Sequence, residues 1–471
     1  MPLTERINRQ LDSVIAIGLV VAVVFTALSH GAVEPWSVAV FELMMIALLL
    51  LWGISMVVTG RLRIHLPATV WPLLALLALG LTQCIVVRDS AGARLSLSKD
   101  IEATRMVVLL LFCLIVACVI AVNFFKRRER LQALLNFLVI FGLALAVFGL
   151  IQHFAWNGKL YWLRPLTVAA ASPFGPFVNH NHFAGYLEML APLPVALIVT
   201  GAASRGRRLF YLFAAAMMGI AVVASLSRAG MISLLAAMLF LLALSFRLRP
   251  QPGRLQHAAS RLGSASAVIV VSLAIVAGIF WIGADPVIDR VTNGKLAGAE
   301  AGAETFHTSR GWIWKDTVRM ISASPVLGVG LGAYQTAWPN YSEADGALIV
   351  DKAHNDYLQL LAEAGIIGGL LALWFIVTVF RLVAQGLRSP DPLMMATAMG
   401  SAAGITAMLV HSFFDFNLQL PSNSLLFLLL TATATQAAAA PETVRDAARA
   451  RQGAMTVSSA ESDLVAGVQW H

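Results

Sequence analysis

Long apolar runs recur along almost the whole chain, and they limit its possible folds more than any other feature. The hydrocarbon core of a bilayer is about 30 Å thick and needs about 20 apolar residues per helix. Runs of this length recur between residues 12 and 439. Charged residues make up 12% of the 471 residues, about half of the share that soluble chains carry. The chain is therefore predicted to be an all-α polytopic membrane protein and not an ordinary cytosolic enzyme.

We expect about twelve membrane helices in this chain. They are predicted at residues 12–29, 36–57, 68–87, 106–124, 131–153, 182–201, 209–225, 229–246, 266–284, 357–382, 393–411 and 421–439. The first run resembles a signal peptide, but it is long for one and many spans follow, so we expect it to be retained. Residues 1–439 are expected to form one transmembrane domain. The alanine-rich, aperiodic residues 440–471 are expected to form a disordered cytoplasmic tail.

The basic residues predict how these helices are oriented. They cluster in alternate loops, near residues 61–63, 126–130, 205–208, 247–261 and 381–388, and at both ends of the chain. Because basic loops stay in the cytoplasm, both termini are expected there. The net charge of +8 then reflects membrane orientation, and no nucleic-acid partner is expected. The largest external loop is predicted at 285–356, with an amphipathic helix at 312–321 lying along the interface.

Two arginines on the external side run against this charge bias. Arg228 lies beside Ser227 in the turn 225–230 between two apolar runs. A guanidinium there can bind a phosphate in a bidentate manner, and the serine adds a hydroxyl donor. Arg310 stands at the start of the amphipathic stretch, where its charge can face the same site. The simpler interpretations are a snorkelling arginine that caps a helix for Arg228 and a solvated loop arginine for Arg310.

The densest polar group, residues 351–358, stands at the entry to a long apolar run. His354 lies near the N-terminal end of the predicted helix, where partial positive charge favours the neutral imidazole that a general base needs. Glu363 lies two turns inside the span, seven residues after Asp356, and an ionisable group at such a position is usually functional. A helix-capping histidine and a buried acid bonded to a neighbouring helix are the structural alternatives.

Other polar or glycine-rich segments are expected to have supporting roles. Asn181 follows an aromatic loop and is expected to bind substrate or to shape that loop; the neighbouring histidines lack further ligands at metal spacing, so no metal is expected. The polar segment 411–417 is expected to be structural or supporting. The glycine-rich residues 328–332 lack a preceding strand and a P-loop lysine, so they are expected to form a loop. Gly365 and Gly369 have a GxxxG spacing that predicts close helix packing.

Taken together, these residues resemble the O-antigen ligase and polymerase superfamily of bacterial cell-envelope enzymes. The likeness rests on His354-Asn355-Asp356-Tyr357-Leu358 followed by Glu363-Ala364-Gly365, on Ser225-Leu226-Ser227-Arg228-Ala229-Gly230, on Thr308-Ser309-Arg310 and on the loop that contains Asn181. It covers roughly residues 170–420, and the first five spans match only in hydropathy. The order and spacing of these motifs are specific to the superfamily and much less so to one member of it.

The resemblance implies a helical membrane glycosyltransferase of the C type in the bacterial inner membrane, with its site on the periplasmic face. Its donor would be a glycan on undecaprenyl diphosphate, used without a nucleotide sugar, a cofactor or an essential metal. Arg228 and Arg310 would bind the diphosphate, and His354 would take the acceptor's proton as it attacks with inversion. The remaining residues implied to bind or orient substrate are Asn181, Ser227, Asn355, Asp356, Tyr357 and Glu363.

The acceptor is left open by the sequence. In a ligase it would be a sugar hydroxyl of the lipid A–core, and the paired external arginines with the His-Asn-Asp loop favour this interpretation. Polymerases of O-antigen or exopolysaccharide and protein O-oligosaccharyltransferases would use the same donor with another acceptor. Membrane lipids are expected as further partners, because the donor and the helices share the bilayer.

Two interpretations from other classes remain. A transporter of an anion such as bicarbonate places its polar residues near the bilayer midplane, among discontinuous helices. Here the polar residues crowd the predicted external boundary instead. A non-catalytic envelope scaffold is the third interpretation, and it predicts that function survives the loss of His354.

Overall fold

The computed structural model describes residues 3–60, 62, 64–88, 94–166, 172–247, 272, 310–343 and 349–439. The predicted span at 266–284, apart from Ser272, lies outside the described residues. So do loop residues 285–309 and the predicted tail at 440–471.

Helix is found at every predicted span that falls within the described residues, so the prediction of an all-α polytopic membrane protein is confirmed, while the total of twelve is untested. The helices are α1 (Leu3–Leu28), α2 (Pro35–Thr59), α3 (Val70–Gln83), α4 (Ile101–Phe124), α5 (Arg128–Phe154), α6 (His180–Leu190), α7 (Pro192–Val199), α8 (Arg205–Ala224), α9 (Arg228–Arg247), α13 (Arg310–Ala323), α14 (Tyr334–Ala337), α15 (Asp356–Gly386) and α16 (Pro392–His411), followed by a helix at 421–439. Short 3₁₀ turns lie at Trp338–Asn340 and Asn417–Gln419. Two antiparallel hairpins pair β1 (Val86–Arg88) with β2 (Arg94–Ser96) and β3 (Lys159–Leu160) with β4 (Arg164–Pro165).

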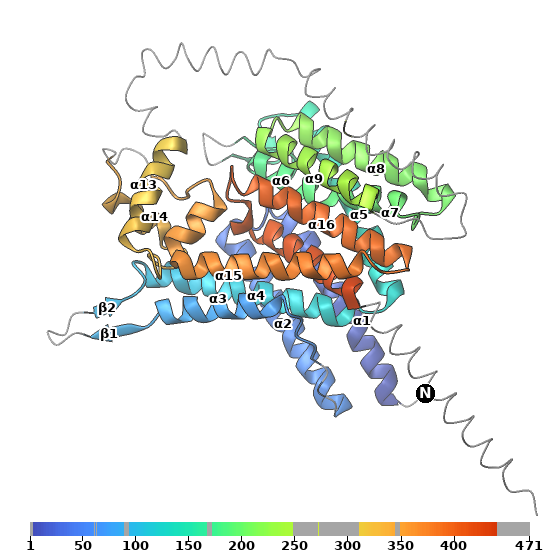
Figure 1. Ribbon diagram of the computed structural model, residues 1–471, viewed down its shortest axis with the longest axis horizontal. Helices are drawn as coiled ribbons and strands as arrows, with labels where there is room; N and C mark the ends of the chain where they lie inside the picture. Colours follow the sequence, from blue (N-terminus) through green and yellow to red (C-terminus); the bar gives the residue numbers. More distant parts are fainter. Residues whose placement is uncertain are drawn as a thin grey trace, which may run out of the picture.

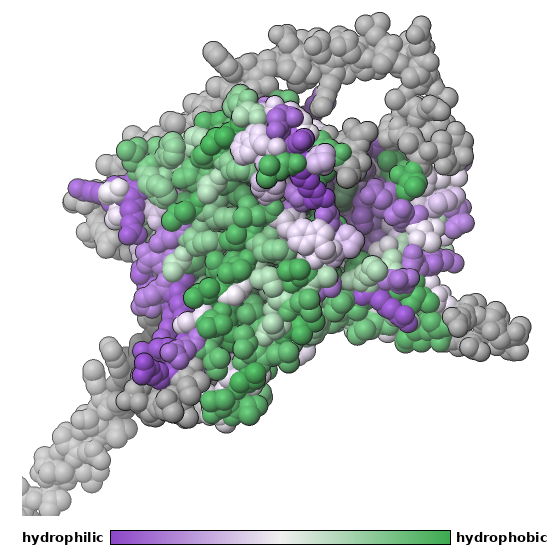
Figure 2. Space-filling view, turned by 180° about the vertical axis from the view of Figure 1, so that it is seen from behind, coloured by the Kyte–Doolittle hydropathy of each residue, from purple (hydrophilic) through white to green (hydrophobic). Residues whose placement is uncertain are grey.

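The length and surface of these helices suit a bilayer. Within the part of the chain that the structure describes, nine helices are long and apolar enough to cross a membrane, with α6 and α7 together counted as one. Figure 2 shows a broad hydrophobic band across one face of the molecule with hydrophilic patches on either side of it. Leu43, Val57, Leu209 and Leu370 are among the large apolar side chains left exposed. Lipid tails are the solvent that such a band needs.

Short polar side chains fix where several helices begin. The side chains of Asp100, Asn179, Asn355 and Asp391 accept hydrogen bonds from backbone N–H groups in the first turn of α4, α6, α15 and α16. The first N–H groups of a helix have no partner within it, so these caps stabilise each start. The cap at Asp100 explains why α4 begins five residues before its predicted start.

Two further spans differ from their predicted outlines. The third helix ends at Gln83, and not at residue 87, because the chain continues into the hairpin of β1 and β2. The span predicted at 182–201 is two helices, α6 and α7, which meet at Ala191 before Pro192 and Pro194. Proline lacks the N–H that a continuous helix uses at these positions.

The long helix α15 is broken inside by Gly365. This residue has φ +62° and ψ −163°, a combination that is essentially open to glycine alone. The loop before α15 bonds to the broken ladder: the N–H of Ile366 donates to the carbonyl of Pro325 at 2.8 Å, and the N–H of Gly330 donates to the carbonyl of Glu363 at 3.0 Å. The prediction that Gly365 serves close helix packing is wrong, since it is loop backbone that approaches this glycine. Residues 328–332 are a loop, as predicted.

The helices form a layered bundle with a separate cap at one end. In Figure 1, α15 lies between α16 and the pair α3 and α4, and α8 and α9 cover the opposite side of α16. The helices α13 and α14 and the hairpin of β1 and β2 gather at one end. Most of the bundle shares one apolar core. A smaller core lies beneath α13, and it consists of Met320, Val329, Ala333, Tyr334, Ala337, Trp338, Ala353 and Ala362.

We expect Gly365→Ala to destabilise the protein by about 2 kcal/mol or more, because alanine is strained at this backbone conformation. A Cβ there would also lie 2.3 Å from the carbonyl carbon of Val326. Thermal unfolding in detergent measures the loss. Gly53→Ala is the matched control, since Gly53 lies inside α2 with no atom within 4 Å of an added Cβ. Equal midpoints for the two variants would contradict the role of this break.

Candidate active site

The buried carboxylate of Asp415 joins residues from distant parts of the chain. It follows the end of α16, and its side chain is 1% exposed. Its Oδ2 accepts a hydrogen bond from Nδ2 of Asn181 at 2.8 Å, and its Oδ1 lies 3.3 Å from Nδ1 of His354. The guanidinium of Arg310 approaches Oδ2 to 4.0 Å. We call Asn181, Ser227, Arg310, His354 and Asp415 the Asp415 cluster.

Asp415 is held in its ionised form. Burial opposes ionisation, but the hydrogen bond from His354 and the rings of His182 and His411 outweigh it, so the pKa of Asp415 lies below its ordinary value of 3.8. Its Oδ1 also accepts the backbone N–H of Phe416 at 2.9 Å. A buried carboxylate needs such partners, because it has lost the water that would otherwise solvate it.

His354 presents a ring that is partly open to solvent. Its side chain is 32% exposed, and its ring packs edge-to-face on Phe416 with centroids 5.0 Å apart. The contact between Nδ1 and Asp415 favours the tautomer with the proton on Nδ1. The other nitrogen, Nε2, then carries the lone pair that a general base uses. His354 also has φ +50°, the left-handed conformation that few residues other than glycine adopt.

The turn between α8 and α9 reaches the same carboxylate through Asn181. The hydroxyl of Ser227 donates to Oδ1 of Asn181 at 2.7 Å and accepts the N–H of Gly230 at 3.1 Å, which caps α9. Leu226 closes the turn with φ +58°. Arg228 follows at once and is exposed, and within the described residues it forms no hydrogen bond or ion pair. An exposed guanidinium beside this cluster is available to an anion.

Two predicted residues next to His354 fasten the start of α15 to the segment that follows α16. Asn355 caps α15 and donates from Nδ2 to the carbonyl of Phe413 at 3.1 Å. The carboxyl of Asp356 accepts from the hydroxyl of Ser412 at 2.9 Å and from the N–H of Leu418 at 3.1 Å. These bonds hold the segment that carries Asp415 against the segment that carries His354.

The hydroxyl of Tyr357 donates to the carbonyl of Leu409 at 2.7 Å. Glu363 makes its contacts elsewhere: its Oε1 accepts from Nε2 of Gln359 at 2.7 Å, and its other contacts are with the backbone of Gly332 and Tyr334. The structure therefore brings together Asn181, Ser227, Arg310 and His354, and it gives Asn355, Asp356, Tyr357 and Glu363 contacts within the fold.

The sequence interpretation missed Asp415 as a site residue, because it regarded the polar segment 411–417 as only structural or supporting. The same segment contributes His411, whose Nδ1 lies 3.0 Å from both carboxylate oxygens of Glu188 on α6, with both side chains fully buried. An acid directly after a long apolar run on the predicted external side was the available signal. Among the described residues, no three His, Cys, Asp or Glu side chains are grouped so as to hold a metal ion.

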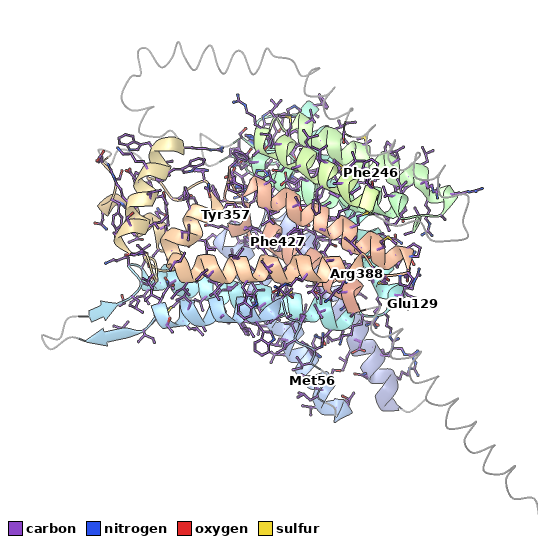
Figure 3. All side chains as sticks on the ribbon, in the orientation of Figure 1. Met56, Glu129, Phe246, Tyr357, Arg388 and Phe427 are labelled. Atoms are coloured by element: carbon purple, nitrogen blue, oxygen red, sulfur yellow. The ribbon has the colours of Figure 1, made fainter. Side chains whose placement is uncertain are left out.

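The Asp415 cluster lies at one end of the bundle, and the basic segment 126–130 lies at the other. The start of α15 and the end of α16 meet at the cluster, so the connection between these helices, at 387–391, is at the far end. There Asp391 pairs with Arg128 at 2.8 Å. Figure 3 labels Tyr357 near the cluster and Arg388 and Glu129 near each other at the far end.

Comparison with known proteins gives two matches. A sequence family described as O-antigen ligase matches residues 213–373, which contain Arg228, Arg310 and His354 but not Asn181 or Asp415. The chain is also 27% identical over 143 residues to the exopolysaccharide production protein ExoQ of Rhizobium meliloti (strain 1021). This second match covers 27% of the chain and 30% of the length of ExoQ.

The low pKa of Asp415 predicts an acid-dependent contribution to stability. A carboxyl group whose pKa is lower in the folded state stabilises the fold above its unfolded value, about 3.9. That contribution is lost as the pH falls towards the folded value. We therefore expect Asp415→Asn to be less stable than the wild type at pH 7, with the difference shrinking below about pH 4. Thermal midpoints between pH 7 and pH 3 measure this, with the exposed Asp351→Asn as the matched control. A constant difference across this range would contradict it.

Proposed function

We propose that the chain, whose residues 213–373 match a family described as O-antigen ligase, acts as a member of the O-antigen ligase and polymerase superfamily and transfers a glycan from undecaprenyl diphosphate to a sugar hydroxyl of the lipid A–core. The single observation that carries the proposal is the Asp415 cluster. In it a half-exposed arginine and a histidine with a free ring nitrogen meet at one buried carboxylate. An anion-binding group next to a supported base is what transfer from a lipid diphosphate requires.

The base in this mechanism is His354. Its Nε2 takes the proton of the acceptor hydroxyl while that oxygen attacks the anomeric carbon of the donor sugar. The bond from the anomeric carbon to the diphosphate oxygen breaks on the opposite face, and its electron pair leaves with the lipid diphosphate. The configuration at the anomeric carbon is therefore inverted. Asp415, bonded to Nδ1, stabilises the imidazolium that forms.

The leaving group needs positive charge more than it needs a proton, because a diphosphate is a stable anion. Arg310 at the start of α13 and Arg228 at the start of α9 would bind it from two sides. Asn181 and Ser227 link the turn that carries Arg228 to Asp415. In this way the anion-binding turn and the base are both fixed relative to one carboxylate. No step in this mechanism uses a metal ion.

The orientation of the protein follows from its charge distribution. Clusters of basic residues remain in the cytoplasm, and the clusters near residues 126–130, 205–208 and 381–388 stand at helix ends away from the Asp415 cluster. The cluster would therefore face the periplasm from the bacterial inner membrane, and both termini would be cytoplasmic. Undecaprenyl-linked glycans presented on that face would reach the site from the lipid.

Polymerisation is the second candidate, and the match to ExoQ favours it. The printed name of that protein refers to exopolysaccharide production. A polymerase would use the same donor, base and arginines, with the end of a lipid-linked glycan as acceptor. The broken helix α15 is weak support for anion transport. In a transporter the freed backbone groups of a broken helix bind the ion, whereas here the loop before α15 already bonds the groups freed at Gly365.

The experiment that tests the function uses the purified protein in lipid with an undecaprenyl-diphosphate glycan and lipid A–core. We expect the wild type to shift the acceptor on a gel and His354→Ala to abolish the shift. His65→Ala is the matched control, since this exposed histidine lies in the connection between α2 and α3. Longer lipid-linked glycan without a shift would establish the polymerase instead. No product of either kind would refute glycan transfer to these acceptors.

Arg228→Lys is expected to lower the transfer rate at least about tenfold, because an ammonium group cannot bind a diphosphate in the bidentate manner of a guanidinium. Initial rates at saturating donor measure the loss. Arg388→Lys, an exposed arginine at the far end of the bundle, should leave the rate unchanged. A near-normal rate for Arg228→Lys would count against its binding of the diphosphate.

A further inference from the structure

The helix α13 carries Arg310 and also contacts the backbone next to His354. Arg310 is its first residue, and Trp314 stands one turn later on the same helix. The indole Nε1–H of Trp314 donates to the carbonyl of Ala353 at 3.0 Å, and Ala353 directly precedes His354. One short helix thus connects the arginine at Asp415 with the histidine at Asp415.

Ala353 is held from its other side as well. Its N–H donates to Oε1 of Gln359 at 2.7 Å, and Nε2 of Gln359 donates to Oε1 of Glu363 at 2.7 Å. All three residues are buried. Both backbone polar groups of Ala353 are therefore fixed, the carbonyl by α13 and the N–H by α15.

His354 needs this support because its own backbone is strained. Its φ of +50° is uncommon for a residue other than glycine or asparagine, and such conformations persist only where the surroundings impose them. Asn355 on its other side is fixed by its role as the cap of α15. The direction of the imidazole thus depends on the two residues that flank it.

The smaller core joins α13 to the segment that contains Ala353 and to the start of α15; we call these three segments the α13 unit. Met320 of α13 shares the smaller core with Ala353 and Ala362, separately from the main core of the bundle. Arg310 and His354 belong to the α13 unit, whereas Asp415 follows α16 of the bundle. The α13 unit contacts the bundle at Asp415. A guanidinium nitrogen of Arg310 lies 4.0 Å from Oδ2 of Asp415, and Nδ1 of His354 lies 3.3 Å from Oδ1.

We infer that Trp314 is a positioning residue for His354, and that α13 transmits occupation of the diphosphate site at Arg310 to the base. This inference rests on the proposed function. An anionic donor bound by Arg310 would hold α13 in place, and Trp314 would then hold the carbonyl of Ala353 and aim His354 at Asp415. Without a bound donor, the imidazole of His354 would be held less firmly in its direction towards Asp415.

The first test needs no turnover. Hydrogen exchange of the peptide 350–358 is measured in lipid for the wild type and for Trp314→Phe, which keeps an aromatic ring and loses only the N–H donor. We expect exchange of this peptide to be about fivefold faster in the variant, because its backbone opens more often. Trp162→Phe is the matched control, since Trp162 lies between β3 and β4 and its indole N–H donates to the carbonyl of Ala155 at the end of α5. Equal exchange in the wild type and Trp314→Phe would overturn the inference.

The second measurement adds undecaprenyl diphosphate as the probe. It should slow exchange of the same peptide in the wild type and much less in Trp314→Phe. Equal slowing in both would show that Trp314 does not transmit binding, which overturns the inference. If the probe does not bind the wild type at all, the proposed function fails, and the transmission that rests on it fails too, whereas the first test still decides whether Trp314 positions the loop.

Kinetics separate positioning from binding. For Trp314→Phe we expect kcat to fall about tenfold or more. The KM for the donor should stay within about twofold of the wild-type value. In the double variant with Asp415→Asn, the loss of kcat should be smaller than the product of the losses in the two single variants, since both substitutions act through His354. A raised KM with normal kcat, or multiplying losses, would assign Trp314 a role in binding or in folding only and would overturn the inference.

Discussion

The ionised carboxylate of Asp415 joins parts of the chain that lie far apart in sequence. It bonds Asn181 from the start of α6 and His354 from the start of α15, and Arg310 approaches it from α13. A buried charge is costly unless it is paired and hydrogen-bonded, so these ends of helices must meet for Asp415 to remain ionised. The need to satisfy one charge thereby determines which loops face each other at this end of the bundle.

Much of the fold could be predicted from the sequence because each span carries its own signal. A run of about 20 apolar residues satisfies its backbone internally and needs no knowledge of its neighbours. The break at Gly365 could not be predicted in this way, because it depends on a loop about 40 residues earlier that bonds the freed backbone groups. A glycine at GxxxG spacing is equally consistent with helix packing, and the sequence does not distinguish the two.

The residues of the candidate site likewise fall into those that the sequence predicts and one that only the packing of helices identifies. Asn181 and His354 could be predicted because each is a polar residue at the boundary of an apolar run, and Arg310 because it is a basic residue at the start of the predicted amphipathic stretch. The acid that supports His354 could not, because Asp351, Asp356 and Asp415 all lie near such boundaries. Only the packing of α15 against α16 selects Asp415. Glu363 shows the converse, since its place inside a span suggested chemistry, whereas its carboxyl group is bonded to Gln359 and faces the loop before α15.

The break in α15 also sets the depth at which the site stands. The helix has 31 residues, more than a bilayer needs. The part after Gly365, residues 366–386, alone spans about 31 Å at 1.5 Å per residue, which is the thickness of the hydrocarbon layer. A hydrocarbon layer crossed by residues 366–386 would leave residues 356–364 outside it, with His354 more than two helical turns from its edge. In the proposed reaction, a hydrophilic sugar chain would then reach the histidine from water, while only the polyprenyl tail of the donor would stay among the lipids.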